Sequence, residues 1–333
     1  MIPSVRDTGG TGWNLAHAIN NVSPHQAIDL TAQKSYINYP TMCDMGNYSK
    51  ALVRKIIEKA DLIAFLGSFR ALYEGLHISV KKLRDKPKLC IFMGSEWRNG
   101  RAGILEHVDK YLKSNYKLIV GSPMMLEPAE DGAKTPCPQG TEWLPLTRGF
   151  KEIASKYGVC NQDSKALAAF EVPKKRVTFM HAPTSEERKG SNTFYRAMTL
   201  AQQMVPYLNF ANVRGQPWVT CLQHLASCDL LFDQDPPFPE TYGGISVEAS
   251  IFKLPIISRI APEAIEFWKR ETSLDSPIIQ WKDDDDLLKK VYLLATNHEA
   301  RREHGQATHD FMKAIHDEKP VVDRFFKIVD DLA

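Results

Sequence analysis

Residues 239–259, PETYGGISVEASIFKLPIISR, have the pattern of a loop, a helix and a strand in immediate succession. The paired glycines Gly243 and Gly244 precede an apolar helical run, and the closing LPIIS has the length and composition of a buried strand. Glu240 and Glu248 stand eight residues apart on either side of the glycines. A helix that begins near Gly244 places Glu248 about one turn inside it and leaves Glu240 in the preceding loop.

Two carboxylates that flank a helix N-terminus suit a ligand with both sugar hydroxyls and phosphate. Carboxylate oxygens accept hydrogen bonds from hydroxyls, and the N-terminal amides of a helix attract phosphate. The same pattern is also typical of a solvated loop glutamate and a helical glutamate that interacts with the helix dipole. The spacing alone favours this second, structural interpretation.

Short apolar runs alternate with amphipathic helical patterns along most of the chain, which is typical of βα units and parallel sheets. In the first half we expect strands near residues 2–5, 26–30, 61–66, 88–93 and 117–120, a short strand over 141–146, and a helix over 48–60. In the second half we expect the strands RVTFMHAP, LNFANV, CDLLFDQ, LPIISRI and SPIIQW, with helices between them. The sequence predicts an α/β fold with two domains, residues 1–160 and 161–319, and a final helix over 320–333 that returns to the first domain.

A second motif, HAPTSEERKGS over residues 181–191, begins as a strand that ends at His181. A polar loop follows, and Lys189 and Gly190 come directly before the next helical pattern. A lysine at this place is a good diphosphate ligand because its charge adds to the amides of the helix N-terminus. An ordinary exposed loop lysine explains the pattern equally well.

Composition excludes several classes of protein. Six scattered cysteines contain no C-x-x-C pair, which argues against a disulfide framework and against zinc, and indicates reduced thiols in a cytoplasmic protein. No signal-peptide pattern or membrane-spanning run is present in the sequence. The ten histidines have no metal-ligand spacing, and we expect Asp233, Asp235 and the run from Asp283 to Asp286 to be structural acids. We therefore predict no bound metal and no cofactor.

The small net charge of +2 hides an asymmetry along the chain. Residues 1–160 contain 21 basic and 15 acidic side chains, a balance of +6, whereas the remainder has 21 and 25, a balance of −4. Random scatter of charge on solvated faces explains this as well as a functional role does. The positive balance of the first domain is compatible with binding to an anionic partner.

The motifs of the second half resemble glycosyltransferase family 4, a family of nucleotide-sugar-dependent enzymes with the GT-B fold. HAPTSEERKGS, CDLLFDQ and ETYGGISVEASIFKLPIIS occur in the family's order on the expected elements, within residues 176–259. The first half is similar more loosely. There, GGTGWNLAHAI resembles the glycine loop and first helix of that fold, and FMGSEWR over residues 92–98 resembles the family's His-Gly-Ser-Glu-x-Arg segment.

The resemblance implies two Rossmann-like domains that face each other across a cleft, and retaining, metal-independent transfer from a nucleotide-sugar, with a UDP-sugar as first choice. It implies that Lys189 and Gly190 bind the donor diphosphate, Glu248 the ribose, and Glu240 the transferred sugar. The other expected donor-binding residues are His181, Arg214, Tyr242, Gly243 and Gly244. The base is expected near NVRGQPW, where Gln216 and Trp218 are further candidates.

The first domain departs from the family at one position. Met93 stands where the family usually has a histidine near the reaction centre, and methionine neither donates a hydrogen bond nor transfers a proton. Glu96 and Arg98 follow the same expected strand, at the end where open α/β sheets bind ligands. We therefore expect Glu96 and Arg98, together with Glu240, to be the catalytic residues.

The glycine loop DTGGTGWN, residues 7–14, first suggests a dinucleotide-binding fingerprint. Leu15 stands where that fingerprint has its third glycine or alanine, although Asp29 lies at a plausible distance for a ribose partner. Because the second half contains a more complete nucleotide motif, we expect this loop to line the cleft on the acceptor side. The residues assigned to it are Asp7, Gly9, Gly10, Thr11, Gly12 and Trp13.

Several functions stay open on the sequence alone. The leading hypothesis is a hexosyl- or pentosyltransferase. The rivals are a nucleotide-sugar epimerase of the same fold, a nicotinamide-dependent oxidoreductase, and a sugar-nucleotide-binding protein without catalysis. The basic first domain suggests an anionic acceptor: DNA with hydroxymethylated bases, as for virus-encoded GT-B enzymes, an anionic lipid or an acidic glycan. Candidate phosphate contacts are Lys81, Lys82, Arg84, Lys86, Lys88, Arg98 and Arg101.

Overall fold

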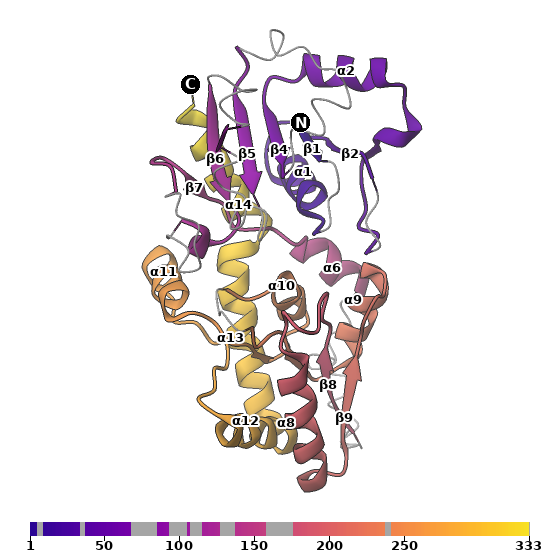
Figure 1. Cartoon of the computed structure of the whole chain (residues 1–333), viewed down its shortest axis with the longest axis vertical. Helices are drawn as coiled ribbons and strands as arrows, with labels where there is room; N and C mark the ends of the chain where they lie inside the picture. The colour runs from indigo at the N-terminus through magenta and orange to yellow at the C-terminus, as the bar shows by residue number, and fades with distance from the viewer. Residues whose placement is uncertain are drawn as a thin grey trace. The chain divides into compact units, whose positions relative to one another are not determined.

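The computed structural model describes residues 1–4, 9–33, 37–67, 85–92, 105–106, 115–126, 137–157, 176–236 and 241–332 (Figure 1). The chain forms two compact units. Unit 1 contains Met1–Gly149 and His316–Ala333, and unit 2 contains Phe150–Ile315. The boundaries that the sequence suggested lie at residues 160 and 319, and those of the structure follow residues 149 and 315.

Unit 1 is built on a sheet of seven parallel strands in the order β3-β2-β1-β4-β5-β6-β7. Its strands are β1 (Ile2–Ser4), β2 (Asp29–Thr31), β3 (Cys43–Asp44), β4 (Ile63–Leu66), β5 (Lys88–Phe92), β6 (Tyr116–Val120) and β7 (Glu142–Trp143). Every residue of β4 and β5 is buried, as expected for parallel strands that are covered on both faces. The described helices of the unit are α1 (Thr11–Val22), α2 (Lys50–Lys59) and α14 (Glu318–Asp330), with the short turns η1 (Met45–Asn47) and η2 (Pro123–Met125).

The two faces of this sheet pack against different helices. Val53 and Ile57 of α2 join one apolar cluster, and Leu15 and Ile19 of α1 join the cluster on the other face. Helix α14, from the end of the chain, packs on α1 and contributes Phe325 to that second cluster. The C-terminal segment therefore completes the core of unit 1.

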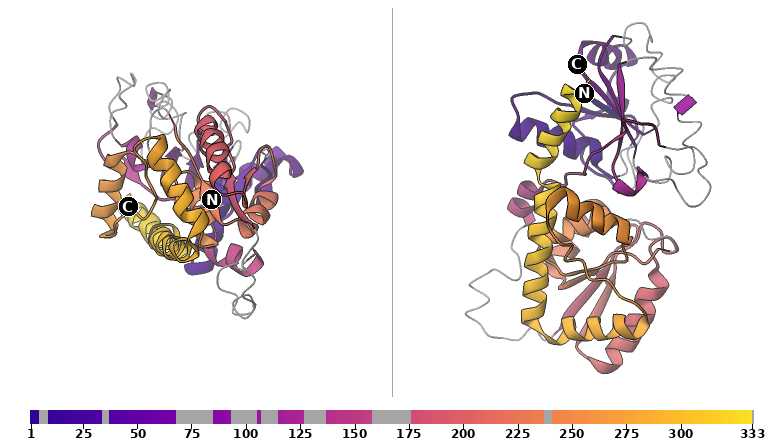
Figure 2. Two further views of the ribbon diagram at one scale, coloured as in Figure 1. Left: turned by 90° about the horizontal axis from the view of Figure 1, so that it is seen from below. Right: turned by 90° about the vertical axis from the view of Figure 1, so that its left-hand side faces the viewer.

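Unit 2 has a four-stranded parallel sheet in the order β11-β10-β8-β9. Its strands are β8 (Val177–His181), β9 (Leu208–Asn212), β10 (Leu230–Phe232) and β11 (Ile256–Ile257). Its helices are α6 (Phe150–Tyr157), α8 (Ser191–Met204), α9 (Trp218–Ser227), α10 (Gly244–Ile251), α11 (Pro262–Thr272), α12 (Asp284–Thr296) and α13 (His298–His316), whose last residue belongs to unit 1. The strands lie inside the unit with helices around them (Figure 2).

Local sequence explains where several of these helices begin. Asp283 is the N-cap of α12 and accepts a hydrogen bond from the Asp286 amide, and the acidic residues of the first turn suit the positive end of the helix dipole. Helix α10 begins at Gly244, where the sequence predicted it. Because all strands of unit 2 are parallel, the loops that precede α8, α9 and α10 leave the same edge of the sheet.

In the described part of the chain, no helix is both long enough and apolar enough to span a bilayer.

Candidate functional site

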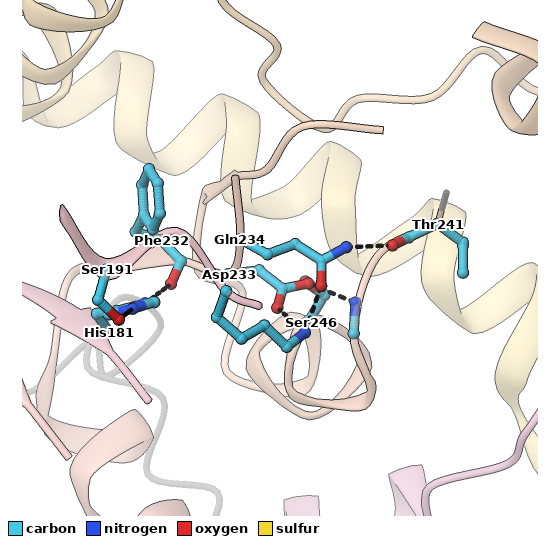
Figure 3. A network of polar contacts seen from close by, with 9 residues as sticks. His181, Ser191, Phe232, Asp233, Gln234, Thr241 and Ser246 are labelled. Carbon is cyan, nitrogen blue, oxygen red and sulfur yellow. Dashed lines mark hydrogen bonds and ion pairs between the residues drawn. The ribbon is translucent and has the colours of Figure 1, made fainter. Parts of the chain in front are cut away.

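Two loops at the carboxyl edge of the unit 2 sheet are joined through Lys189, which contacts Asp233 and Gln234. Figure 3 shows Asp233 and Gln234 beside Ser246 of α10. Lys189 Nζ lies 3.2 Å from Asp233 Oδ1 and also donates to Gln234 Oε1. The Asp235 amide donates back to the Lys189 carbonyl at 3.1 Å. The lysine that precedes α8 is therefore fixed to the segment that follows β10.

Asp233 connects the same cluster to the N-terminus of α10. Its side chain is fully buried, and its Oδ2 accepts hydrogen bonds from the Gly243 amide and from Ser246 Oγ, the latter at 2.7 Å. Helix α10 has no acidic residue in its first turn, so this carboxylate provides the negative charge that a helix N-terminus favours. The sequence interpretation treated Asp233 as a loop acid and missed its link to Lys189. A carboxylate directly after a strand, with Gly-Gly-x-Ser before the next helix, was the available signal.

The glycines of the cluster are required for close approach. Gly190 has a φ of +63°, and a Cβ there would lie 2.2 Å from the Asp235 carbonyl oxygen. At Gly243 a Cβ would lie 2.7 Å from both Asp233 Oδ1 and Lys189 Nζ. No larger residue fits at either position without moving this cluster.

His181 is fully buried beside the cluster and joins β10 to α8. Its Nδ1 donates to the Phe232 carbonyl at 3.0 Å, which leaves Nε2 as the acceptor for the Ser191 hydroxyl at 2.8 Å. Burial lowers the pKa of this imidazole, which agrees with a neutral ring. Both ring nitrogens already make hydrogen bonds within the protein. In this arrangement His181 positions Ser191, the first residue of α8, and has no ring nitrogen left to bind a donor substrate.

Glu248 is buried inside α10, 3% exposed, and lies against the start of α9. Its Oε1 accepts a hydrogen bond from the indole Nε1 of Trp218 at 3.0 Å. Burial and the negative charge of Glu248 raise the pKa of the neighbouring Cys221 thiol to about 12. The structure thus brings together two of the residues that the sequence placed around the nucleotide, and Trp218 orients the carboxylate.

The other donor-side candidates lie in different environments. The Tyr242 ring is buried and stacks on Trp268 with 4.5 Å between ring centres, and burial raises the pKa of its phenol well above the usual value. Only the backbone of Tyr242 can therefore serve a ligand here. Arg214 is exposed after β9 and pairs with Glu186, with 3.0 Å between Nη1 and Oε2.

The described part of the glycine loop in unit 1 leads directly into α1. Gly10 is the N-cap residue, with a φ of +65°, and a Cβ there would lie 2.3 Å from the Tyr39 ring. Thr11, Gly12 and Trp13 form the buried first turn, and Trp13 stacks on His17. The carbonyl of Gly9 accepts a hydrogen bond from the Arg148 guanidinium, a contact that the sequence interpretation did not anticipate.

One sequence interpretation in unit 1 needs correction. Lys88 is buried within β5 and its Nζ donates to the Lys86 carbonyl at 2.6 Å, so the proposal that it contacts phosphate from the surface is wrong. Asp29 is also buried and accepts hydrogen bonds from Thr41 Oγ1 at 2.6 Å and the Met42 amide at 2.8 Å. It holds the chain before β3, which counts against its use as a dinucleotide ribose ligand.

The remaining predicted positions lie outside the described residues. They include all three residues assigned to catalysis, Glu240, Glu96 and Arg98, and also Asp7 of the glycine loop. Met93, Lys81, Lys82, Arg84 and Arg101 lie outside the described residues as well.

No protein-family model and no curated protein matches the sequence. Solved structures do match. Anabaena Alr3699/HepE in complex with UDP and glucose aligns at a TM-score of 0.62 and 12% identity, over 99% of this chain and 100% of that one. A glycosyltransferase from Rickettsia africae aligns at 0.61 and 11% identity, over 99% and 97%. WaaG, a glycosyltransferase involved in lipopolysaccharide biosynthesis, aligns at 0.56 and 11% identity, over 98% and 99%. The chain therefore has the α/β GT-B fold, with two Rossmann-like domains.

Proposed function

We propose that the chain is a glycosyltransferase that takes a sugar from a nucleotide diphosphate donor. UDP is the first candidate for the nucleotide part of that donor. The observation that carries this proposal is the buried Glu248 carboxylate, oriented by Trp218 at 3.0 Å, one turn inside the helix that follows the Gly243-Gly244 pair. A buried carboxylate that a hydrogen bond to one oxygen holds in a single orientation can accept hydrogen bonds from the two hydroxyls of a ribose. Supporting it, similar solved structures contain UDP.

In this proposal the donor lies along the carboxyl edge of the unit 2 sheet. Lys189 and the N-terminus of α8, which begins after Gly190, hold the diphosphate. An ammonium group has three N–H donors, and Asp233 and Gln234 take two of them, so one remains for a phosphate oxygen. The Gly244 amide lies beside this position, whereas the Gly243 amide already donates to Asp233. Arg214 lies on the side of the base.

Transfer requires stabilisation of the leaving diphosphate, where negative charge develops in the transition state. Lys189 and the positive end of α8 supply that stabilisation from fixed positions and without a metal. Glu240 would contact the transferred sugar, and Glu96 and Arg98 would act from unit 1. Retention of anomeric configuration is part of the proposal and rests on the resemblance to family 4.

The pairing of Lys189 with Asp233 favours one second candidate, a protein that binds a sugar nucleotide without transferring the sugar. A lysine that already shares its charge with a buried carboxylate stabilises a leaving diphosphate less than a lysine without such a partner. A glycosyltransferase and a non-catalytic binding protein would both bind the sugar nucleotide, but only the glycosyltransferase would transfer the sugar.

A nucleotide screen followed by a turnover assay tests the proposal. The melting temperature should be measured with UDP, GDP and ADP. It should rise with UDP, because a ligand that binds the folded state stabilises it. Radiolabelled UDP-sugars should then release UDP, and Glu240→Ala should lower that turnover while leaving UDP binding in place. Binding without any turnover supports the second candidate, and formation of an epimer supports an epimerase. Absence of any nucleotide effect contradicts both.

A further inference from the structure

Arg148 is a buried cation beside the glycine loop of unit 1. The residue is 5% exposed, its Nη1 donates to the Gly9 carbonyl, and its guanidinium carbon lies 6.0 Å from the centre of the Tyr39 ring. Both the loop and Arg148 belong to unit 1, so their relation does not depend on the placement of unit 2.

The charge of Arg148 has no counter-ion in the described part of the chain. None of the ion pairs formed there includes it, and its buried Nε has no hydrogen-bond acceptor. Burial of an unpaired charge is unfavourable, so buried guanidinium groups normally have an anionic partner. With Nη1 used by Gly9, the side chain keeps the edge formed by Nε and Nη2. That edge is the fork with which arginine holds phosphate or carboxylate by two parallel hydrogen bonds.

The N-terminus of α1 adds a second positive feature at the same loop. Gly10 is its N-cap and provides no side-chain cap, and no acidic residue occurs in the first turn. The positive end of the helix dipole and the guanidinium therefore both lie at the Gly9–Gly10 backbone. The positive charge of Arg148 also contributes, after burial, to the lowered pKa of His316.

Two more buried polar atoms in unit 1 lack partners, one in the first turns of α1 and one on the residue before Arg148. Asn14 donates through Nδ2 to the Gly10 carbonyl at 2.7 Å, while its Oδ1 has no hydrogen-bond partner. Thr147, next to Arg148 in the chain, has a buried Oγ1 without a partner. Buried polar atoms in proteins are rarely unsatisfied, and a bound ligand is one way to satisfy them. The set offers donors from Arg148 and an acceptor from Asn14, which suits a phosphate ester that also carries a hydroxyl group.

We infer that Arg148 and the N-terminus of α1 form a phosphate-binding site in unit 1, and that it holds a phosphate group of the acceptor. The identification of the ligand as the acceptor rests on the proposed function, in which unit 2 holds the donor nucleotide. The existence of the anion site does not rest on it.

Equilibrium dialysis of the full chain with radiolabelled inorganic phosphate tests the site. Wild type should bind phosphate, and Arg148→Gln should weaken that binding at least 10-fold. Arg324→Gln is the matched control, because Arg324 is also in unit 1, donates to the Trp143 carbonyl at 2.7 Å and lies over the Trp143 ring at 4.5 Å. The control should bind phosphate like wild type. Equal binding by Arg148→Gln, or no binding by wild type, overturns the site.

If Arg148→Gln does not fold, Arg148→Lys replaces it in the same assay. Lysine keeps the positive charge beside Gly9 but lacks the planar fork that binds phosphate with two parallel hydrogen bonds. Phosphate binding should again be weaker than in wild type, and unchanged binding overturns the site.

Repeating the dialysis with saturating UDP separates the two proposals. Phosphate that stays bound through Arg148 while UDP is bound supports an acceptor site. Phosphate that UDP displaces from wild type shows that the donor uses this arginine, which overturns the acceptor assignment. If UDP does not bind at all, the proposed function fails, while phosphate binding that depends on Arg148 still upholds the anion site.

Discussion

Lys189 Nζ and Asp233 Oδ1 lie 3.2 Å apart, and this pair joins the loop before α8 to the loop before α10. The Asp233 side chain is fully buried, and the Lys189 side chain is 21% exposed. The lysine that binds the diphosphate in the proposed donor site is thus held in place by a carboxylate that also accepts hydrogen bonds from Gly243 and Ser246 at the start of α10.

Asp233→Asn should destabilise the protein strongly. The amide keeps the shape of the side chain but removes the charge that Lys189 and the N-terminus of α10 both face. Loss of one partner from a buried pair costs about 3–5 kcal/mol. Urea denaturation followed by circular dichroism measures it. Asp284→Asn, in the exposed pair with Arg196, is the control and should cost about 1 kcal/mol or less. Equal effects of the two changes would show that the buried pair has no special role.

Gly190→Ala should cost more stability than Gly215→Ala. The two glycines have nearly the same φ, +63° and +64°, so the strain on an alanine backbone is matched, at about 1–2 kcal/mol. Only at Gly190 does the added Cβ meet another atom, the Asp235 carbonyl oxygen at 2.2 Å, whereas nothing lies within 4 Å at Gly215. Urea denaturation of both variants measures the difference. If they lose the same free energy of unfolding, the contact between the two loops is looser than described.

Acidification should weaken the protein through His316. Burial, and the nearby positive charge of Arg148, lower the pKa of this imidazole from 6.5 to about 4, although its Nδ1 bonds the Leu146 carbonyl. Between pH 6.5 and about 4 the unfolded chain binds a proton at His316 that the folded chain does not bind. The contribution of His316 to the free energy of unfolding is therefore complete above pH 6.5 and is lost as the pH falls toward 4. The loss should reach about 3 kcal/mol.

His316→Asn is the variant that tests this assignment. Asparagine can still donate to the Leu146 carbonyl but does not titrate in this range. The dependence of the free energy of unfolding on pH between 4 and 6.5 should become shallower than in wild type. An unchanged slope would assign the dependence to other groups.

Trp218→Phe should weaken UDP binding by about 10-fold while the protein stays folded. Phenylalanine fills most of the space of the indole but lacks the Nε1–H that orients Glu248, and a hydrogen bond to a charged group contributes about 1.5–3 kcal/mol. Isothermal titration with UDP measures the affinity. Trp268→Phe, in the same unit but stacked on Tyr242, serves as the control and should bind UDP normally. Equal affinities in both variants would remove Trp218 from the donor site.

Local patterns in the sequence predicted most of the sheet and the start of α10. Apolar runs located the main strands within a few residues, because parallel strands covered on both faces are continuously apolar. The two-residue strands β3 and β7 give weaker signals: Cys43–Asp44 was not predicted, and Glu142–Trp143 was anticipated only as a short strand.

The contacts of the candidate site were less predictable, since they join distant segments. Lys189 and Asp233 are 44 residues apart, and their pairing depends on how two loops leave the sheet. Lys88 was expected at the surface because charge runs are usually solvated, although it is the first residue of a strand that the sequence itself predicted. Arg148 follows β7 without any motif, so its place beneath Gly9 becomes visible only in three dimensions.

The affinity for UDP of Glu248→Gln, beside that of Glu263→Gln, tests the central claim most directly. Glu248 is buried in α10, and Glu263 is exposed in the first turn of α11 of the same unit. Isothermal titration should show UDP binding to wild type and to Glu263→Gln. Binding to Glu248→Gln should be 10- to 100-fold weaker, because the ribose loses a charged acceptor. Equal affinity of the two variants, or no binding of UDP to wild type, would contradict the proposed donor site.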